Sequence, residues 1–464
     1  MLGYTNYIVL TNKREFGNGI NNNTLEFISN NQDVKLCITA DHGSSNETHI
    51  AKIVKMNIDV IITDHHKLRE DGAPKSANAF INPQQEEDPL FREISGCAVA
   101  YLLMYWLIKS NDVTIEKDNR LLGLVAVSII GDMMNLSDPV NRSLTLTGLS
   151  NFNFSPLGKA FMKVLNLEFI DSKDISFKVV PMINSCSRVS ESYIGYVSLL
   201  EKSEDIMIEN VEYLLELNNR RKLIQNKLIV NANGQLKANR KTNVIVLPGS
   251  GTGINGVIAS QLSNGTKRPT IVFINGETVC SGSCRGFIPA LDVKECFDYI
   301  HKTDPTIFQV VEGDVKYGGH AGAAGCSVYK EKLNDFDKMF DDYVRDLNYN
   351  VRDMIRAQKD NAIDITNIKN LGMELMKTRQ LAPFGNGWEN PLLLVRPETI
   401  KNVRKIVLSG GNTILVKFVV RLDDQDYNFT YFHNANLDLE LKGSDILCTA
   451  DIKRTISFDV KELI

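Results

Sequence analysis

Carboxylates and imidazoles follow two short apolar segments near the start of the chain. Asp41 ends the strand-like run in ITADHG, and Asp64, His65 and His66 stand together in IITDHH. Carboxylate and imidazole groups that converge on one point suit Mn²⁺ or Mg²⁺ bound for phosphoryl chemistry. A third acid, Asp132 in SIIGDMMNLSDPVNR, follows another apolar segment, and we expect it to reach the same point. The alternative is that Asp41 and Asp64 are helix N-caps.

A parallel sheet would bring these side chains together. Residues 34–41 and 59–64 are rich in β-branched and apolar side chains and predict two strands, and residues 46–56 between them have helical character. A strand, a helix and a second strand in this order form a βαβ unit with parallel strands. Ligands of open α/β sheets bind beyond the carboxyl ends of the strands, where both polar groups lie. We therefore predict an α/β fold with the site at this sheet edge.

Length and composition are those of a folded protein with several domains. The chain has 464 residues, a formal net charge of −4 and 43% hydrophobic residues, which indicates about two to four domains and excludes a disordered chain. The slight acidity argues against a protein that coats DNA by basic charge alone. The sequence contains neither an apolar run of ~18 residues nor a signal-like N-terminus, so we expect a cytoplasmic protein. The eight cysteines form no Cys-x-x-Cys pair, which favours reduced thiols over disulfides or zinc.

The pattern of elements changes along the chain and predicts five parts. A charged helical stretch over residues 199–232 lacks Gly and Pro, and a new strand at residues 243–247 opens a second α/β segment. From about residue 375, five short alternating strands are typical of an OB-type β-barrel. The predicted parts are a parallel-sheet domain at 1–195, a connecting helix at 196–235, a smaller α/β domain at 236–345, a helical linker at 346–374 and an OB-type nucleic-acid-binding domain at 375–464.

The ordered motifs resemble those of the DHH phosphoesterase superfamily. ITADHG, TDHH, ISGCAVAYLL and VAVSIIGDMMNLSDPVNR stand in the order and rough spacing of that family. INSCSR is similar to the INAAGR motif of its RecJ single-stranded-DNA exonuclease branch, and LAPFGNGWENP resembles the stretch before the OB-type domain of that branch. GGHAGAAG and SGSCRG resemble the DHH-associated domain. The resemblance covers nearly the whole chain, and the ordered set is far more specific than any single motif.

The resemblance implies a role for each matching residue at the sheet edge. Asp41 would bridge two metal ions, His65 and Asp132 would ligate the second ion, and His66 would contact the scissile phosphate. Asp41, His65 and His66 are thus the implied catalytic residues, and Asp41, His65 and Asp132 the implied metal ligands. The implied cofactor is Mn²⁺ or Mg²⁺ in a two-metal site.

Contacts with substrate phosphates are implied for a second set of residues. Glycines let backbone N–H groups approach an anion closely, and arginine can hold a phosphate through two hydrogen bonds. Taken alone, each arginine would be a solvated surface residue and the Gly-Gly-His a turn, so only the motif order favours binding. The set comprises Arg14, Asn184, Arg188, Arg285, Gly318, Gly319 and His320.

One family motif is missing. The family carries an Asp-x-Asp at the end of its first strand, and the 40 residues before Asp41 contain none. Residues 5–20 resemble the following family segment instead, with Arg14 and Gly17 as counterparts of its arginine and first glycine. Asp335 and Asp337 form an Asp-x-Asp, but in a charged, helical context. Three explanations stay open: a start placed too late or a split gene, a strand supplied by another chain, or a relative that binds DNA or scaffolds other proteins without turnover.

We expect a metal-dependent exonuclease that hydrolyses phosphodiester bonds of single-stranded DNA from the 5′ end, in DNA repair, recombination or replication. One alternative is a catalytically impaired DNA-binding or scaffold relative. Another is a phosphodiesterase for oligonucleotides or cyclic dinucleotides, which the long segment after the Gly-Gly-His domain disfavours. The expected partners are single-stranded DNA and, from the resemblance alone, a single-strand-binding protein or a helicase. We expect a monomer without membrane contacts.

Overall fold

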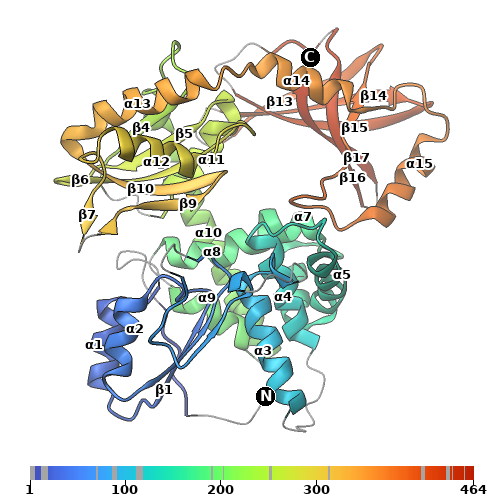
Figure 1. The fold of residues 1–464 in the computed structure, drawn as a ribbon. Helices are drawn as coiled ribbons and strands as arrows, with labels where there is room; N and C mark the ends of the chain where they lie inside the picture. The colour runs from blue at the N-terminus through green and yellow to red at the C-terminus, as the bar shows by residue number, and fades with distance from the viewer. Residues whose placement is uncertain are drawn as a thin grey trace. The chain divides into compact units, whose positions relative to one another are not determined.

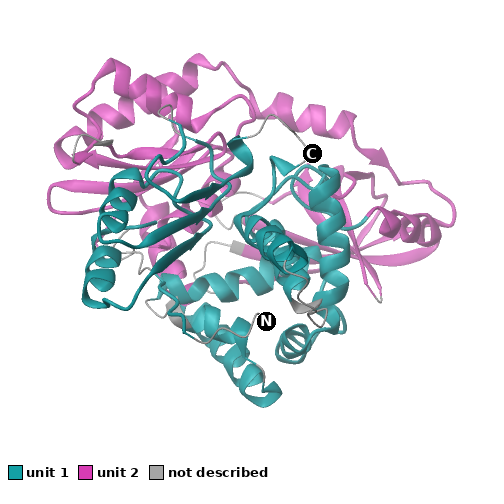
Figure 2. Cartoon of the chain, turned by 60° about the horizontal axis from the view of Figure 1, so that its bottom comes forward, with its two compact units in different colours: residues 1–220, 382–389 teal, residues 221–381, 390–464 magenta. Residues whose placement is uncertain are grey.

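The computed structural model of the chain (Figure 1) forms two compact units. Unit 1 contains residues 1–220 and 382–389, and unit 2 contains residues 221–381 and 390–464 (Figure 2). The described residues include no helix that is long and apolar enough to cross a membrane. They are 6–11, 19–68, 72–85, 91–110, 119–189, 192–201, 203–249, 253–311, 314–408, 413–434, 439–441, 443–453 and 455–464.

Unit 1 begins with the predicted βαβ unit. Strands β1 (Leu36–Ala40), β2 (Asp59–Thr63) and β3 (Ala79–Ile81) pair in parallel in that order. Helix α2 (Glu47–Val54) connects β1 to β2, and α1 (Asn22–Asn30) lies beside α2 in Figure 1. Isoleucines and a valine from these helices and from β2 form a common core. The predicted parallel sheet is confirmed, and it places the residues after β1 and β2 at one edge.

Helices follow this sheet along the chain, and the last of them continues beyond Arg220 into unit 2. Residues Gly96–Ser110 and Asn119–Gly131 form the apolar helices α3 and α4. Asp138 caps α5 by accepting a hydrogen bond from Asn141 N, and Ser155 caps α6 by accepting one from Gly158 N. The helices pack through a core of aliphatic and aromatic side chains. Their bounds are α3 Gly96–Ser110, α4 Asn119–Gly131, α5 Pro139–Phe154, α6 Pro156–Leu165, α7 Ser172–Asp174, the π-helical η4 Ile175–Val179, α8 Val180–Arg188, α9 Ser192–Leu200 and α10 Glu204–Asn233.

Unit 2 opens with a mixed sheet in the order β4-β5-β6-β10-β9. β4 and β5 are parallel, and the other neighbouring pairs are antiparallel. Phenylalanines and four buried cysteines fill the core between this sheet and its helices. The elements are β4 Asn243–Leu247, α11 Asn255–Thr266, β5 Thr270–Ile274, β6 Val279–Arg285, α12 Val293–Thr303, β7 Val310–Val311, β8 Asp314–Val315, β9 Tyr317–His320, β10 Ala323–Tyr329 and α13 Leu333–Asp346.

The Asp-Phe-Asp sequence noted above lies in α13. Phe336 is fully buried, and the Asp337 carboxylate forms ion pairs with Arg240 and Lys237. This carboxylate therefore takes part in the packing of α13 within unit 2.

The C-terminal strands form one sheet in the order β11-β12-β16-β17-β15-β14-β13. Five of these strands were predicted from the sequence. The two that were missed are the two-residue β11 and β17, which forms a hairpin with β16. The bounds are α14 Val351–Asp360, β11 Ile363–Asp364, α15 Leu371–Thr378, β12 Leu393–Val395, β13 Ile400–Val407, β14 Thr413–Leu422, β15 Gln425–Asn434, β16 Ile446–Ile452 and β17 Ile456–Leu463.

This sheet must be strongly curved, as the predicted OB-type barrel requires. β12 and β13 lie five strand spacings apart in the sheet order, about 24 Å if the sheet were flat. Only residues 396–399 join them, and such a link spans at most about 18 Å. The sheet must therefore curl so that its ends approach each other. The pairings among the described strands do not include one between β12 and β13, so the predicted barrel is not closed by a ladder.

Candidate metal centre

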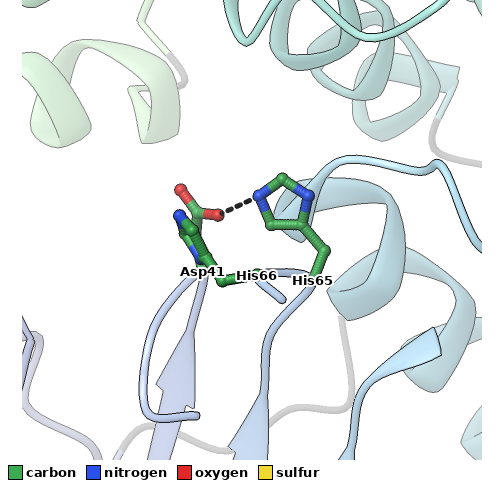
Figure 3. A group of neighbouring side chains, drawn as sticks. All are labelled: Asp41, His65 and His66. Atoms are coloured by element: carbon green, nitrogen blue, oxygen red, sulfur yellow. Dashed lines mark ion pairs between the residues drawn. The ribbon is translucent and has the colours of Figure 1, made fainter. Parts of the chain in front are cut away.

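The carboxyl ends of β1 and β2 carry the candidate site. Asp41 follows β1 directly, has φ +66° and donates its backbone N–H to Thr63 O at 3.0 Å. A non-glycine residue rarely adopts this left-handed conformation, and such residues often mark functional sites. His65 and His66 follow β2. Figure 3 shows the three side chains gathered above the two strand ends.

His65 lies between two carboxylates. Its Nε2 is 3.1 Å from Asp41 Oδ1 and 3.2 Å from Asp132 Oδ2. Asp132 comes directly after α4, so the predicted convergence of a third acid is found. This Nε2 is buried and makes no hydrogen bond of normal geometry. A buried nitrogen that faces two acidic oxygens without a well-aligned hydrogen bond fits a cation held among the three groups.

His66 completes the group of possible ligands. One ligand atom each from Asp41, His65 and His66 lies within 4.8 Å of the others. Carboxylate oxygen suits hard divalent ions such as Mg²⁺ and Mn²⁺, and imidazole accompanies it at many transition-metal sites. The residues present therefore fit a divalent metal, while the metal and catalytic roles given to each residue stay predictions.

The buried Asp64 carboxylate forms the centre of a hydrogen-bond network next to the histidines. Its carboxylate accepts hydrogen bonds from the Ser44 N–H at 2.9 Å and the Ser44 hydroxyl at 2.6 Å, and His66 Nδ1 lies 2.7 Å away. Asn82 Nδ2 donates to Ser44 Oγ at 2.9 Å and to His66 O at 3.0 Å. These contacts join residues up to 38 positions apart in the sequence, and they hold the His66 ring in place.

Charge around the cluster shifts the pKa of three groups. Burial alone would raise the pKa of Asp64, but hydrogen bonds from His66 and Ser44 outweigh it and hold that pKa well below its usual range. The hydrogen bond to Asp64 raises the pKa of His66. Burial lowers the pKa of His65, yet Asp41 and Asp132 prevail and raise it. In the metal-free protein both imidazoles are therefore more easily protonated than usual.

The N-cap interpretation is wrong for both strand-end acids. Helix α2 begins after Asn46, so Asp41 does not cap it. The next α-helix among the described residues after Asp64 is α3, which begins at Gly96. Both acids stand in loops at the sheet edge, where Asp41 belongs to the cluster and the buried Asp64 carboxylate contacts His66.

Gly96 supports the cluster, a role that was not predicted from the sequence. A Cβ at this first position of α3 would overlap the Asp41 side chain. Only glycine lets the helix approach the carboxylate so closely. The signal was present in ISGCAVAYLL, where a glycine precedes an apolar helix. The contact itself could not be read from sequence because the two residues are far apart in the chain.

The implied phosphate-binding residues of the associated domain share one region of unit 2. In the sheet register, Ala323 pairs with Arg285 on one side and with His320 on the other. Residues directly opposite each other on neighbouring strands face the same side of a sheet. Arg285 and His320 therefore lie on one face, about 10 Å apart across the intervening strand.

Local packing shapes this region. Gly319 has φ +142°, and a Cβ there would lie 2.5 Å from Ala323 O. The Arg285 guanidinium donates to Cys284 O at 2.7 Å and packs against Gly256 at the start of α11. Burial lowers the pKa of Arg285, although an arginine stays charged at neutral pH.

The other implied substrate contacts come from several elements. Helix α8 carries Asn184, which is exposed, and Arg188, which is partly buried, four residues apart on one helix face. Arg14 and Gly17 lie outside the described residues. Gly318 is an exposed residue of β9 beside Gly319. The roles of all these residues stay predictions.

Comparison with known proteins places the chain in a family. Residues 2–129 match the DHH family, N-terminal domain, and residues 239–346 match the DHHA1 domain. The single-stranded-DNA-specific exonuclease RecJ of Haemophilus influenzae is 28% identical over 334 residues, which cover 68% of this chain and 56% of that protein. The chain is a RecJ-like member of the DHH superfamily. RecJ of Bacillus subtilis is 26% identical over 419 residues, which cover 87% of this chain and 49% of that protein.

Solved RecJ structures share the fold of this DHH protein. The structure of RecJ from Thermus thermophilus in complex with Mn²⁺ has a TM-score of 0.72 at 20% identity and covers 94% of this chain and 62% of its own. A structure of exonuclease RecJ bound to manganese has a TM-score of 0.54 at 22% identity and covers 69% of this chain and 78% of its own. The chain spans about half the length of the curated relatives that it matches.

Proposed function

We propose that this DHH protein is a divalent-metal-dependent exonuclease that hydrolyses phosphodiester bonds of single-stranded DNA from the 5′ end. The observation that carries the proposal is the convergence of Asp41, His65 and Asp132 at one sheet edge. The names of its relatives, which are single-stranded-DNA-specific exonucleases, support the substrate class. DNA repair, recombination or replication is the process we infer from the family resemblance.

Asp41, His65 and Asp132 would hold Mn²⁺ or Mg²⁺. A bound divalent ion supplies Lewis acidity to a phosphoryl oxygen and lowers the pKa of a coordinated water. The chain itself fixes the positions of the ligands. Asp41 and His65 follow the carboxyl ends of β1 and β2, and Asp132 directly follows the last residue of α4. We extend the proposal to a two-metal site because phosphodiester displacement needs charge neutralised on both the attacking and the leaving oxygen.

His66 would act on the scissile phosphate. The Asp64 carboxylate occupies Nδ1, so Nε2 is the nitrogen left to face a substrate. The contact with Asp64 orients the ring so that Nε2 can donate a hydrogen bond to a phosphate oxygen that gains charge during displacement. Arg285 and His320, on one face of the sheet in unit 2, would bind the substrate phosphates.

The C-terminal sheet has a surface that suits a single strand. Phe432 of β15 is 63% exposed. It lies opposite Leu415 on the neighbouring strand β14, and Leu415 lies opposite Ile406 on β13. The adjacent row on the same face carries Lys417 opposite Arg404, both exposed. An aromatic ring beside basic side chains binds unpaired bases by stacking and the backbone by charge. A single-strand-binding protein or a helicase as partner is suggested by the family resemblance alone.

A strand-specific degradation assay tests the proposal. The purified full chain is incubated with Mn²⁺ and single-stranded DNA labelled at the 5′ or the 3′ end. A parallel reaction contains a blunt-ended duplex with the same labels. We expect labelled mononucleotides to appear first from the 5′-labelled strand. They should be released from single-stranded DNA and not from the duplex. Asp41→Ala and His65→Ala should reduce the rate at least about 100-fold.

Two matched variants control for folding. Asp59 lies at the opposite end of β2, about 16 Å along the strand from the site, and His49 lies in α2. Asp59→Ala and His49→Ala should retain activity. Wild-type protein that binds single strands but releases no nucleotide would overturn the nuclease proposal in favour of a binding protein. Cleavage confined to two- to four-nucleotide substrates would point to an oligonucleotide phosphodiesterase.

A further inference from the structure

A short segment far along the chain packs on the loop that follows Asp132. Residues 382–389 belong to unit 1, although the chain on both sides of them belongs to unit 2. We propose that Asn386 in this segment is a positioning residue that holds the Asp132 carboxylate in place for metal binding. This inference rests on the proposed function, because it gives Asp132 the role of a metal ligand.

Asn386 contacts both ends of the turn after Asp132. Its side-chain Nδ2 donates to Met133 O at 2.6 Å, and its main-chain carbonyl accepts from Leu136 N at 2.7 Å. Met133 has φ +56°. A side chain with a Cβ disfavours that conformation, which persists only where the surrounding structure holds it. Asn386 is the residue that bonds directly to the Met133 carbonyl.

The helix before the turn fixes only its first half. Asp132 N donates to Ser128 O at 2.8 Å, and Met134 N donates to Ile129 O at 3.0 Å, as in the last turn of α4. Leu136 N instead donates to the segment. Metal-ligating carboxylates need support that keeps them within about 0.5 Å of the productive geometry. The hydrogen bond that Asn386 donates to Met133 O and the one that it accepts from Leu136 N supply such support immediately after the ligand.

Arg142 and Ser172 anchor the segment independently of Asn386. The Arg142 guanidinium donates to Pro383 O at 3.2 Å and to Ala382 O at 3.3 Å, and its Cζ lies 4.5 Å from the centroid of the Trp388 ring. The Ser172 hydroxyl donates to Phe384 O at 2.7 Å. The position of the segment is therefore set by several groups, so that Asn386 can act as a fixed support.

Two glycines let the segment come close to the turn. Gly387 has φ +72°, and a Cβ there would overlap the side-chain oxygen of Asn135. A Cβ at Gly385 would lie 2.7 Å from Leu136 Cδ1. Gly385 and Trp388 exchange two backbone hydrogen bonds, at 2.9 and 3.1 Å, which close the segment into a tight turn. The backbone itself is thus shaped to reach the loop that carries the ligand.

The test compares Asn386→Ala with a matched asparagine. Asn153 also lies in unit 1, and its Nδ2 donates to Leu149 O and Ile170 O, each at 2.8 Å. The dissociation constant of Mn²⁺ is measured by calorimetry on the full chain, together with hydrogen exchange of residues 132–136. We expect Asn386→Ala to raise the dissociation constant about tenfold and to speed exchange in this stretch. Asn153→Ala should leave both within twofold of wild type.

The outcomes separate this inference from the metal site itself. If the wild type binds Mn²⁺ and Asn386→Ala binds it with the same affinity, the positioning role of Asn386 is overturned but the metal site is not. An equal loss in both variants would also overturn it, because that result would reflect general destabilisation. A wild type that binds no Mn²⁺ would overturn the proposed metal centre. If Asn386→Ala fails to fold, Arg142→Gln, which removes the two bonds to the segment carbonyls, should weaken Mn²⁺ binding in the same direction.

Discussion

His66 Nδ1 lies 2.7 Å from a carboxylate oxygen of Asp64, whose side chain is 2% exposed. The buried acid therefore sets which ring nitrogen of His66 points away from the protein interior. Carboxylate–histidine pairs of this kind fix ring orientation and tautomer at many metal sites. In this DHH protein the pair stands directly behind the Asp41–His65 contact, so the Asp64 carboxylate supports the cluster without having to touch substrate.

Replacing Asp64 should reduce activity. Asp64→Asn keeps the size of the side chain but removes the charge that raises the pKa of His66. We expect kcat on a 5′-labelled single strand to fall about 10- to 100-fold. Asp59→Asn is the control, because Asp59 begins the strand that Asp64 follows and its carboxylate accepts a hydrogen bond from Asn78 at 2.8 Å. Equal rates for wild type and Asp64→Asn would show that the pair has no part in catalysis.

The stability of the metal-free protein should depend on pH through the same pair. The pKa of His66 is raised above 6.5, so its contribution is fully present below about pH 6.5 and is lost as pH rises through the raised value. The pKa of Asp64 is lowered from 3.8, so its contribution is present above about pH 3.8 and is lost as pH falls through the lowered value. The pair therefore stabilises the fold most between about pH 4 and pH 6.5.

Denaturant unfolding of wild type and His66→Gln with a chelator present checks this dependence. The difference in the free energy of unfolding between the two proteins should be larger at pH 5.5 than at pH 8.5. A difference that grows with pH would contradict the assigned direction of the His66 shift.

Gly96→Ala should disturb the metal centre. The added Cβ overlaps Asp41, so either the carboxylate or the start of α3 must move. We expect weaker Mn²⁺ binding and a lower degradation rate. Gly265→Ala is the control, since a Cβ at this helical position meets no atom within 4 Å and should stabilise α11 by about 0.5–1 kcal/mol. Unaltered Mn²⁺ affinity in Gly96→Ala would mean that the contact with Asp41 has no functional weight.

Arg285 should act on substrate affinity. Arg285→Ala is expected to raise KM for single-stranded DNA with little change in kcat, and to reduce the salt dependence of log Kd by about 0.7 for one lost phosphate contact. Arg285→Lys should restore affinity only in part, because lysine cannot hold a phosphate through a planar fork. Arg268→Ala is the control, since its guanidinium bonds Lys237 O and Ala238 O. A salt slope unchanged in Arg285→Ala would remove this residue from the phosphate contacts.

Sequence reasoning reached the sheet edge because strand-end residues of parallel strands share one edge by geometry. Asp41 and His65 could be paired in this way from the sequence, and Asp132 was added because it follows another apolar segment. The N-cap alternative failed because the helix after Asp41 has its own cap, Asn46. Strand β17 was missed because Ile456–Leu463 carries charges among its apolar residues and follows β16 after a short turn.

Contacts between distant segments were beyond sequence reasoning. The bonds from Ser44 and Asn82 around Asp64, and the overlap of Gly96 with Asp41, depend on where separate loops meet. The packing of Asn386 on Met133 joins residues 253 positions apart. A single sequence shows a glycine or an asparagine at such positions but not the neighbour that gives it a role.

The central claim is that Asp41, His65 and Asp132 bind a divalent metal, and Mn²⁺ titration of the full chain by calorimetry tests it most directly. The account predicts saturable binding by the wild type and by Asp59→Asn, and affinity at least about 100-fold lower in His65→Ala and Asp132→Asn. Equal Mn²⁺ affinity in all four proteins, or a wild type that binds no Mn²⁺, would contradict it.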